Sequence, residues 1–170
     1  MAYNSKQNEY SRSRKSEFQK KMLELRRVAR VVAGGRRFSF RAAIVLGDKK
    51  GRVGFGIGKG QDAALAMEKA EREAKKNMFL VPFGKNNAIP FTVEAKYKAA
   101  HIIMRPSSKG RGLVAGGAVR VVLDLAGITN TSAKILSHTK NKINNARAAM
   151  LALSQLKTLP SDEQSNAKIK

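Results

Sequence analysis

Residues 34–60 read GGRRFSFRAAIVLGDKKGRVGFGIGKG, and this stretch decides the fold of the N-terminal half. Alternate residues are apolar along its first part: Phe38, Phe40, Ala42, Ile44 and Leu46. Because Arg37, Ser39 and Arg41 lie between them, the period of two predicts a strand with one buried face and one mostly polar, basic face. A turn over residues 47–51 leads to a second strand, which places Val53, Phe55 and Ile57 on one face and Gly54, Gly56 and Gly58 on the other. We therefore expect a hairpin with one apolar side that packs in a core. The other side, which carries glycines and basic residues, is expected to bind a partner.

The net charge restricts the class of partner. The 170 residues include 34 Lys and Arg but only 12 Asp and Glu, which gives a net charge of +22 and favours a polyanion, of which nucleic acid is the commonest. The chain has no apolar run of transmembrane length, no basic amphipathic helix with bulky apolar residues and no Trp, so we expect no membrane partner. The polar N-terminus lacks the apolar core of a signal peptide, which predicts a cytoplasmic location. No metal site is expected, because Cys is absent and the two His residues are isolated.

The pattern along the chain predicts an α+β fold of two modules. Residues 1–20 are expected to form a flexible basic arm, and residues 21–81 a β-β-β-α module. In its first strand, at residues 21–32, the apolar phase slips near Arg26-Arg27, which indicates a bulge or a change from helix to strand. Its helix is expected to begin at Asp62 as the N-cap and to cover the apolar face of the sheet.

The second module follows a linker rich in Pro, Gly and Asn at residues 82–90. Residues 91–156 should form a β/α module with strands near 91–97, 101–105 and 132–137. A helix ends at Gly127, and Asn141 or Asn144 caps the last helix. Residues 157–170 read as a polar tail.

The glycine cluster at residues 54–60 does not fit a nucleotide-binding loop. No register supplies the glycine spacing of the dinucleotide fingerprint, and Val53 and Gly60 occupy positions where a P-loop needs Gly and a hydroxyl residue. Alternate glycines in a strand instead predict that another backbone approaches closely, with a β-bulge or tight helix packing as the structural alternative. Carboxylates are scattered and no nucleophile–base motif occurs, so we expect no enzyme, no cofactor and no small-molecule substrate. A nucleotide-dependent enzyme using the glycine-rich hairpin is kept as an alternative to be tested.

Basic residues gather on the predicted loops and exposed faces. Each cluster alone is typical of a solvated surface, but several together favour contacts with phosphates, which position a protein without reading base sequence. The phenylalanines of the hairpin are assigned to the core, so RNA read by its shape is favoured over base stacking. A free-standing double-stranded-RNA chaperone is the alternative within the RNA-binding class.

Two long motifs resemble the bacterial small (30S) ribosomal subunit protein five family. The first, RVVAGGRRFSFRAAIVLGDKKGRVGFGIGKG, precedes an Ala/Lys/Glu helix ending in KKNM. The second runs from AIPFTVEAKYKAAHIIMRP through GRGLVAGGAVRVVLDLAGI to NKINNARAAM, so the resemblance covers residues 20–156. Departures from the family pattern are Ala33 in place of Lys, Lys109 and Arg111 before the Gly-Gly-Ala helix, and Lys142 in place of Pro.

The resemblance implies a double-stranded-RNA-binding-like N-terminal module and a C-terminal module of the ribosomal domain-two type. It also implies binding to 16S rRNA and contact with small-subunit proteins four and eight. Members of the family help to line the mRNA entry channel and support decoding accuracy, so contact with mRNA at that channel is implied as well. Residues 32–38 match the family loop that reaches toward the head–body junction and is associated with spectinomycin sensitivity. Gly112 and Arg120 match positions at the interface with protein four. The residues expected to contact rRNA are Arg26, Arg27, Arg30, Gly34, Gly35, Arg36, Arg37, Arg41, Lys49, Lys50, Arg52, Gly54, Gly56, Lys59, Lys109, Arg111, Lys140, Lys142 and Arg147.

Overall fold

The computed structural model describes residues 17–156, which form two antiparallel sheets and three α-helices. The first sheet has the order β1-β2-β3-β4, with β1 at Gln19–Val32, β2 at Gly35–Gly47, β3 at Arg52–Gly60 and β4 at Phe79–Leu80. The second has the order β5-β6-β7, with β5 at Val93–Tyr97, β6 at Ala100–Pro106 and β7 at Thr131–Ile135. The helices are α2 (Ala63–Lys76), α3 (Gly117–Ala126) and α4 (Lys142–Gln155), and a 3₁₀ turn, η1, spans Lys85–Asn87. The predicted α+β fold is confirmed; β4 and η1 were not predicted.

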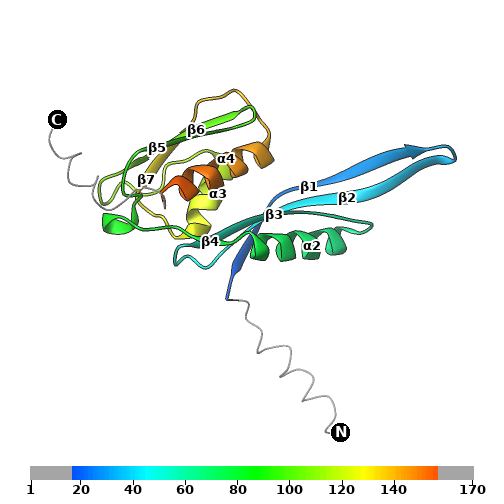
Figure 1. Cartoon of the computed structure of the whole chain (residues 1–170), viewed down its shortest axis with the longest axis horizontal. Coiled ribbons are helices and arrows are strands. Elements are labelled where there is room, and N and C mark those ends of the chain that lie inside the picture. Colours follow the sequence, from blue (N-terminus) through cyan, green and yellow to red (C-terminus); the bar gives the residue numbers. More distant parts are fainter. Residues whose placement is uncertain (1–16, 157–170) are drawn as a thin grey trace, which may run out of the picture.

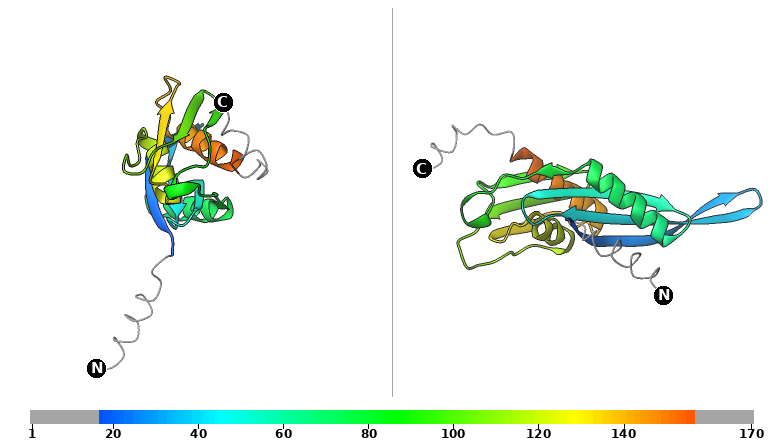
Figure 2. Two further views of the ribbon diagram at one scale, coloured as in Figure 1. Left: turned by 90° about the vertical axis from the view of Figure 1, so that its left-hand side faces the viewer. Right: turned by 90° about the horizontal axis from the view of Figure 1, so that it is seen from below.

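These elements form four layers. Helix α2 covers one face of the first sheet, while α3 and α4 lie on its other face, between the two sheets (Figure 1; Figure 2, right). One continuous apolar core joins Val53 and Phe55 of β3 to residues of α3, α4 and the second sheet. The two modules therefore share a core.

The glycine face of β3 packs directly against α2. A Cβ atom added at Gly54, Gly56 or Gly58 would stand 2.1–2.2 Å from the carbonyl oxygen of Ala74, Ala70 or Ala66, respectively. Two strand residues advance by about 6.6–6.8 Å and four helix residues by about 6.0 Å, so alternate glycines meet every fourth alanine. The structure shows tight helix packing, which was the structural alternative, and the expectation that this face is open to a partner is wrong.

Strand β2 is buried on both faces over its second half, which corrects the prediction of one polar face. Ala42, Ile44 and Leu46 face α2, as expected. Ala43 and Val45 face the other way, into the core shared with α3 and α4. The basic face of this strand therefore ends at Arg41, because the second module covers the later residues of the strand.

The irregularity of β1 lies nearer its start than predicted. Met22 pairs with Ile44 and Glu24 with Ala43, so Leu23 is the extra residue of a bulge. Leu23 is buried. From Glu24 to Val32 the register is regular, and the proposed slip at Arg26-Arg27 is absent.

The turn between β2 and β3 is fixed to the C-terminal end of α3. Backbone N–H groups of Lys49 and Gly51 donate to the carbonyl oxygens of Leu125 (3.0 Å) and Ala126 (2.9 Å). Gly127 ends the helix with a φ of +87°, and a Cβ atom there would stand 2.2 Å from the Lys49 carbonyl oxygen. These bonds satisfy helix-end carbonyls that would otherwise lack partners and orient one module on the other.

The predicted helix boundaries are mostly confirmed. Asn141 caps α4, since its side-chain oxygen accepts from the backbone N–H groups of Ile143 (3.0 Å) and Asn144 (3.4 Å). Asp62 occupies the N-cap position of α2 without a side-chain capping bond. The segment 82–90, expected as a linker, has Ile89 buried in the shared core. Residues 1–16 of the expected arm and the whole tail, 157–170, lie outside the described residues.

Candidate nucleic-acid interface

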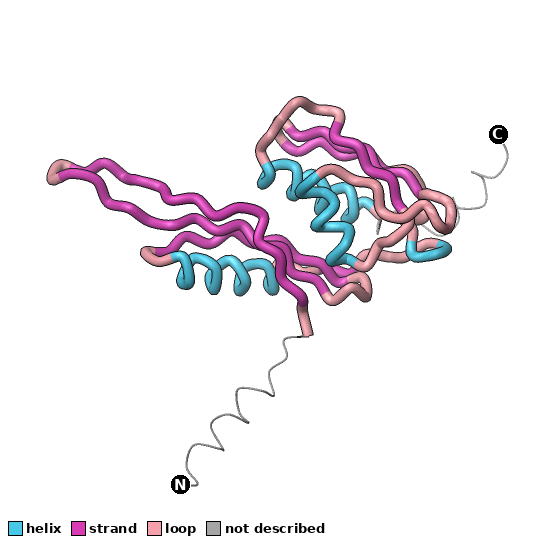
Figure 3. The backbone as a smooth tube through the Cα atoms, turned by 180° about the vertical axis from the view of Figure 1, so that it is seen from behind, coloured by secondary structure: helices cyan, strands magenta, loops and turns pink. Residues whose placement is uncertain are grey.

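Strands β1 and β2 extend beyond the rest of the molecule as a two-stranded projection, which we call the finger and define as residues 26–41. Strand β3 pairs with β2 only between Phe40 and Gly47, so Gly35–Ser39 pair with β1 alone. The register places Val32 opposite Gly35, with Ala33 and Gly34 as the two-residue turn. Figures 1 and 3 show the finger extending past the end of α2.

The finger carries six arginines and no acidic residue. Arg26 pairs directly with Arg41, and Arg30 with Arg37. Lys59 of β3 lies opposite Arg41 in turn, so these five residues share one side, which we call the basic face. Like charges placed directly opposite each other destabilise a hairpin, and this cost is relieved when an anion lies against them.

Among the described residues, the acidic counter-charge on this face is found only at its base. Glu24 accepts from Arg26 at 2.8 Å and lies 3.5 Å from Arg41. Nearer the tip, Arg30, Arg36 and Arg37 are exposed and have no hydrogen-bond or ion-pair partner between residues 17 and 156. The tip is therefore the part of the described surface best suited to bind phosphates.

The opposite side of the finger is partly apolar, which corrects the assignment of Phe38 to the core. The Phe38 side chain is 48% exposed, and the Arg27 guanidinium carbon lies 3.7 Å from the centre of its ring. Phe40 does pack against the residues under α2, and Phe55 is buried in the shared core. The sequence pattern could not separate these rings, because burial depends on where β3 and α2 end.

The structure separates the other predicted contacts from the finger. Gly54 and Gly56 lie beneath α2, so their assignment to rRNA contact is wrong. Lys49, Lys50 and Arg52 are exposed at the opposite end of β2 and β3, where Arg52 Nε lies 3.3 Å from Asp48.

The predicted rRNA contacts of the second module lie in three places: the loop of Lys109, the start of α4, and a groove that holds Arg147. Lys109 and Arg111 are exposed in a loop whose Ser107 N–H donates to the Asn130 carbonyl oxygen. The Asn130 side chain in turn donates to the Asn86 carbonyl oxygen of η1, which lies at the end of the molecule away from the finger (Figure 1). Lys140 and Lys142 are exposed at the start of α4, which is the end of that helix nearer the finger (Figure 1). Two further residues were expected at a protein interface. Gly112 directly follows Arg111, and Arg120 lies on α3.

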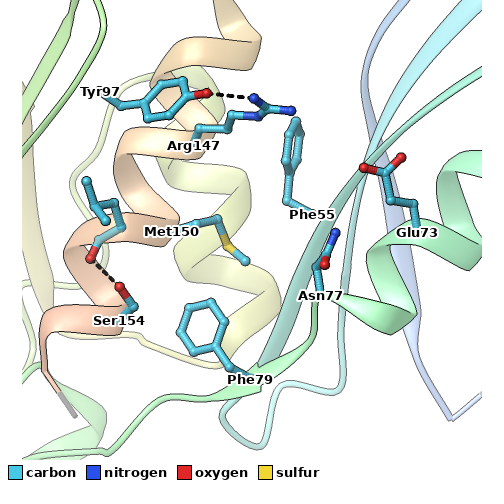
Figure 4. Close-up of a pocket in the computed structure, with 9 residues that line it drawn as sticks. Phe55, Glu73, Asn77, Phe79, Tyr97, Arg147, Met150 and Ser154 are labelled. Atoms are coloured by element: carbon cyan, nitrogen blue, oxygen red, sulfur yellow. Dashed lines mark hydrogen bonds between the residues drawn. The ribbon is translucent and has the colours of Figure 1, made fainter. Parts of the chain in front are cut away.

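Arg147 lies inside a groove between the two modules. The groove has a volume of about 390 Å³ and is lined by residues of α2, β3, β4, β5 and α4 (Figure 4). Arg147 donates a 2.6 Å hydrogen bond to the Tyr97 hydroxyl and lies near the rings of Tyr97 and Phe55. The hydrogen bond, aided by the charges of Arg147 and Lys98, lowers the pKa of Tyr97 below its ordinary value. Arg147 thus contacts side chains of both modules, which distinguishes it from the exposed cations.

The described residues show no candidate metal centre. Residues 17–156 contain no cluster of three or more His, Cys, Asp or Glu that could hold a metal ion. No helix of this region is long and apolar enough to span a membrane. The features that distinguish this surface are exposed arginines on a projecting hairpin.

Part of this arrangement could have been read from the sequence. A two-residue turn at Ala33-Gly34 would set Arg30 opposite Arg37 and Arg26 opposite Arg41. The same register sets Glu24 opposite Ala43, on the same side as Arg26 and diagonal to Arg41, so its two ion pairs could also have been anticipated.

Comparisons with known proteins agree with this architecture. Residues 18–82 match the N-terminal domain of ribosomal protein S5, and residues 95–166 match its C-terminal domain. The small ribosomal subunit protein uS5c of Cyanophora paradoxa is 49% identical over 148 residues, which cover 87% of each chain. The protein uS5 of Prochlorococcus marinus strain MIT 9215 is 47% identical over 85% of this chain and 70% of its own, and uS5c of Guillardia theta is 42% identical over 93% of both.

These matches cover both modules in the order in which the structure has them. They also agree with the expectation from the scattered carboxylates, since the family consists of structural ribosomal proteins and not of enzymes. The chain belongs to the ribosomal protein S5 family, whose curated members are named small ribosomal subunit protein uS5.

Proposed function

We propose that this protein is a structural constituent of the small ribosomal subunit and binds 16S rRNA through the finger. The observation that carries the proposal is the set of six arginines on a projecting hairpin without any acidic residue. Such a surface repels itself in isolation and becomes favourable against phosphates, each contact releasing counterions from the RNA. Family membership supports the choice of rRNA over other polyanions.

The mechanism is electrostatic and geometric. The Arg26–Arg41 and Arg30–Arg37 pairs lie four residues apart along the strands, a separation of roughly 13 Å, so they reach different phosphates. The base of the finger continues into the buried part of β2, which keeps its direction fixed relative to both modules. The protein therefore holds RNA segments at a set distance without reading base sequence.

The finer roles extend this proposal to the assembled subunit in the cytoplasm. The finger tip, residues 32–38, is placed toward the head–body junction, where it helps to organise the subunit. Other surfaces line the channel by which mRNA enters, and the protein supports translational accuracy. Gly112 and Arg120 contact small-subunit protein four, and protein eight is a second neighbour. The half-exposed backbone of Gly112 and the exposed side chain of Arg120 are compatible with such an interface.

The first experiment measures the affinity of the full chain for 16S rRNA over a series of salt concentrations. Replacing Arg36 and Arg37 together with Ala should weaken binding and reduce the slope of log K against log salt by about 0.7–0.9 for each phosphate that is no longer neutralised. The matched control replaces the exposed Lys75 and Lys76 of α2, which removes the same charge away from the finger. An equal slope change in both variants would show that only net charge matters and would contradict the assignment to the finger.

A second experiment separates a ribosomal constituent from a free RNA chaperone. The protein is expected to sediment with small subunits after a high-salt wash, because many contacts hold an integral constituent. Recovery only in the free fraction would contradict the proposal. Nucleotide titration tests the enzyme alternative, and binding of nucleotide that Gly56→Ala abolishes would revive it.

A further inference from the structure

The finger has a second side, opposite its basic face. We call it the aromatic face and define it as Arg27, Ala29, Val31, Arg36 and Phe38, which the register places on one side of the two strands. Phe38 is 48% exposed and Val31 75% exposed. These two side chains form an exposed apolar surface between the arginines of the finger.

The surroundings of Phe38 leave its ring accessible. Ala29, directly opposite on β1, is too small to cover it. Arg27 is the diagonal neighbour, and its guanidinium lies over the ring at 3.7 Å from the centre. On the tip side, Arg36 and Val31 form the next cross-strand pair, and both are exposed.

None of the helices and strands within residues 17–156 covers Phe38 on this face. Strand β3 ends at Gly60, opposite Phe40, and α2 begins beside Gly60, since the Ala66 N–H lies 2.6 Å from the position of a Cβ atom there. Phe38 lies two residues farther toward the tip. The apolar contact that α2 gives Phe40 is therefore absent at Phe38.

We propose that Arg27 and Phe38 form a stacking site for one unpaired base of the RNA that the finger binds. The proposal rests on the proposed function and deepens it. The Arg27 guanidinium, whose carbon lies 3.7 Å from the ring centre, is a second planar group beside the ring, and Arg planes and aromatic rings are the groups on which unpaired bases stack. Arg27 and Arg36 flank the site with positive charge, which suits a nucleotide and gives no advantage to a neutral apolar partner. One ring and one valine are also far less than the roughly 800 Å² per partner of a standard protein interface.

The finger then uses its two sides differently. The basic face binds phosphates, and the aromatic face accepts a base that has left its helix. Loss of stacking should lower affinity by about 5- to 150-fold without changing the number of phosphates neutralised. Loss of an arginine on the basic face should change the salt dependence instead.

The test uses the full chain and 16S rRNA transcribed in vitro, with affinity measured over a salt series. Phe38→Leu removes the ring and keeps an apolar side chain, Arg27→Lys keeps the charge and removes the planar group, and Arg37→Gln removes a charge from the basic face. Phe38→Leu and Arg27→Lys are expected to weaken binding at unchanged salt slope, whereas Arg37→Gln lowers the slope by about 0.7–0.9. Ultraviolet cross-linking should join the Phe38 peptide of the unmodified protein to a base that is unpaired in the rRNA. Thermal unfolding checks that each variant is folded.

The outcomes separate the stacking site from the proposed function. If Phe38→Leu and Arg27→Lys both bind as the unmodified protein does while Arg37→Gln lowers the slope, stacking is refuted and rRNA binding by the finger stands. If the unmodified protein binds 16S rRNA without salt dependence, the proposed function itself fails. If Phe38→Leu binds rRNA normally but is washed more easily from small subunits, the aromatic face contacts a protein, and the stacking site is refuted.

Discussion

Replacing Gly56 with Ala tests the packing of β3 against α2. The new Cβ atom would stand 2.2 Å from the Ala70 carbonyl oxygen and 2.4 Å from the Ala74 backbone nitrogen. Because ordinary contacts begin near 3.4 Å, the helix must retreat by roughly 1 Å. The atoms that clash belong to the backbone, so no change of side-chain rotamer relieves them.

The magnitude follows from three contributions. Overpacking costs about 1–3 kcal/mol. A retreat of about 1 Å also forfeits up to half of the dispersion energy of neighbouring contacts, including those at Gly54 and Gly58. The strand regains about 0.5–1 kcal/mol because Ala loses less entropy than Gly on folding. We expect a net loss of about 2 kcal/mol in the free energy of unfolding, which lowers the Tm by about 4–8 °C for a chain of this size.

The assay is thermal unfolding followed by far-ultraviolet circular dichroism. Gly34→Ala is the matched control, because no atom lies within 4 Å of its added Cβ atom, and its Tm should stay unchanged or rise slightly. Ala70→Gly should not rescue Gly56→Ala, since the clashing oxygen remains. A Tm for Gly56→Ala equal to that of Gly34→Ala would refute the close contact between strand and helix.

Three further substitutions test other contacts. Asn141→Ala removes the cap of α4 and should lower the free energy of unfolding by about 0.5–2 kcal/mol in chemical denaturation, whereas Asn141→Asp keeps the acceptor and most of the stability. Gly127→Ala should lower the free energy of unfolding more than Gly110→Ala does in the same assay. Both glycines have positive φ, but only a Cβ atom added at Gly127 would clash with the turn between β2 and β3. Tyr97 should lose its proton at lower pH than a free tyrosine, as followed by NMR of labelled tyrosine, and Arg147→Gln should raise its pKa. Because the pKa of Tyr97 is lowered in the folded state, its contribution to the free energy of unfolding is present above the ordinary tyrosine pKa and is lost as the pH falls through the folded-state pKa. The same pH dependence of stability in the unmodified protein and in Arg147→Gln would contradict this prediction.

The order of elements could be predicted because it follows from local chemistry. Alternating apolar residues specified β2, and the special backbone of Gly127 and the side chain of Asn141 specified the ends of two helices. These signals act over a few residues and are therefore visible in the sequence. The double burial of β2 was not, because Ala43 and Val45 are covered by helices that come much later in the chain.

The candidate site was predictable in composition but not in shape. The arginines near Gly34 and Gly35 were expected to contact RNA, and the structure exposes most of them on the finger. Small residues, in contrast, are ambiguous: Gly56 has the same lack of a side chain whether a surface is open to RNA or pressed against a helix. Phe38 was misassigned for a related reason, since an apolar residue in an alternating pattern is buried only if another element reaches it.

The match between alternate glycines of β3 and every fourth alanine of α2 has a consequence for how family members can change in length. The two repeats differ by about 0.7 Å per step, so the match holds for a few steps and then drifts out of phase. A deletion of two residues from β3 would need a deletion of about four residues from α2 to restore the contacts. A deletion of one residue from β3 would instead turn its side chains toward the helix. Insertions and deletions in these two segments should therefore occur together in relatives, whereas the finger, which β3 and α2 do not cover, is free to vary in length on its own.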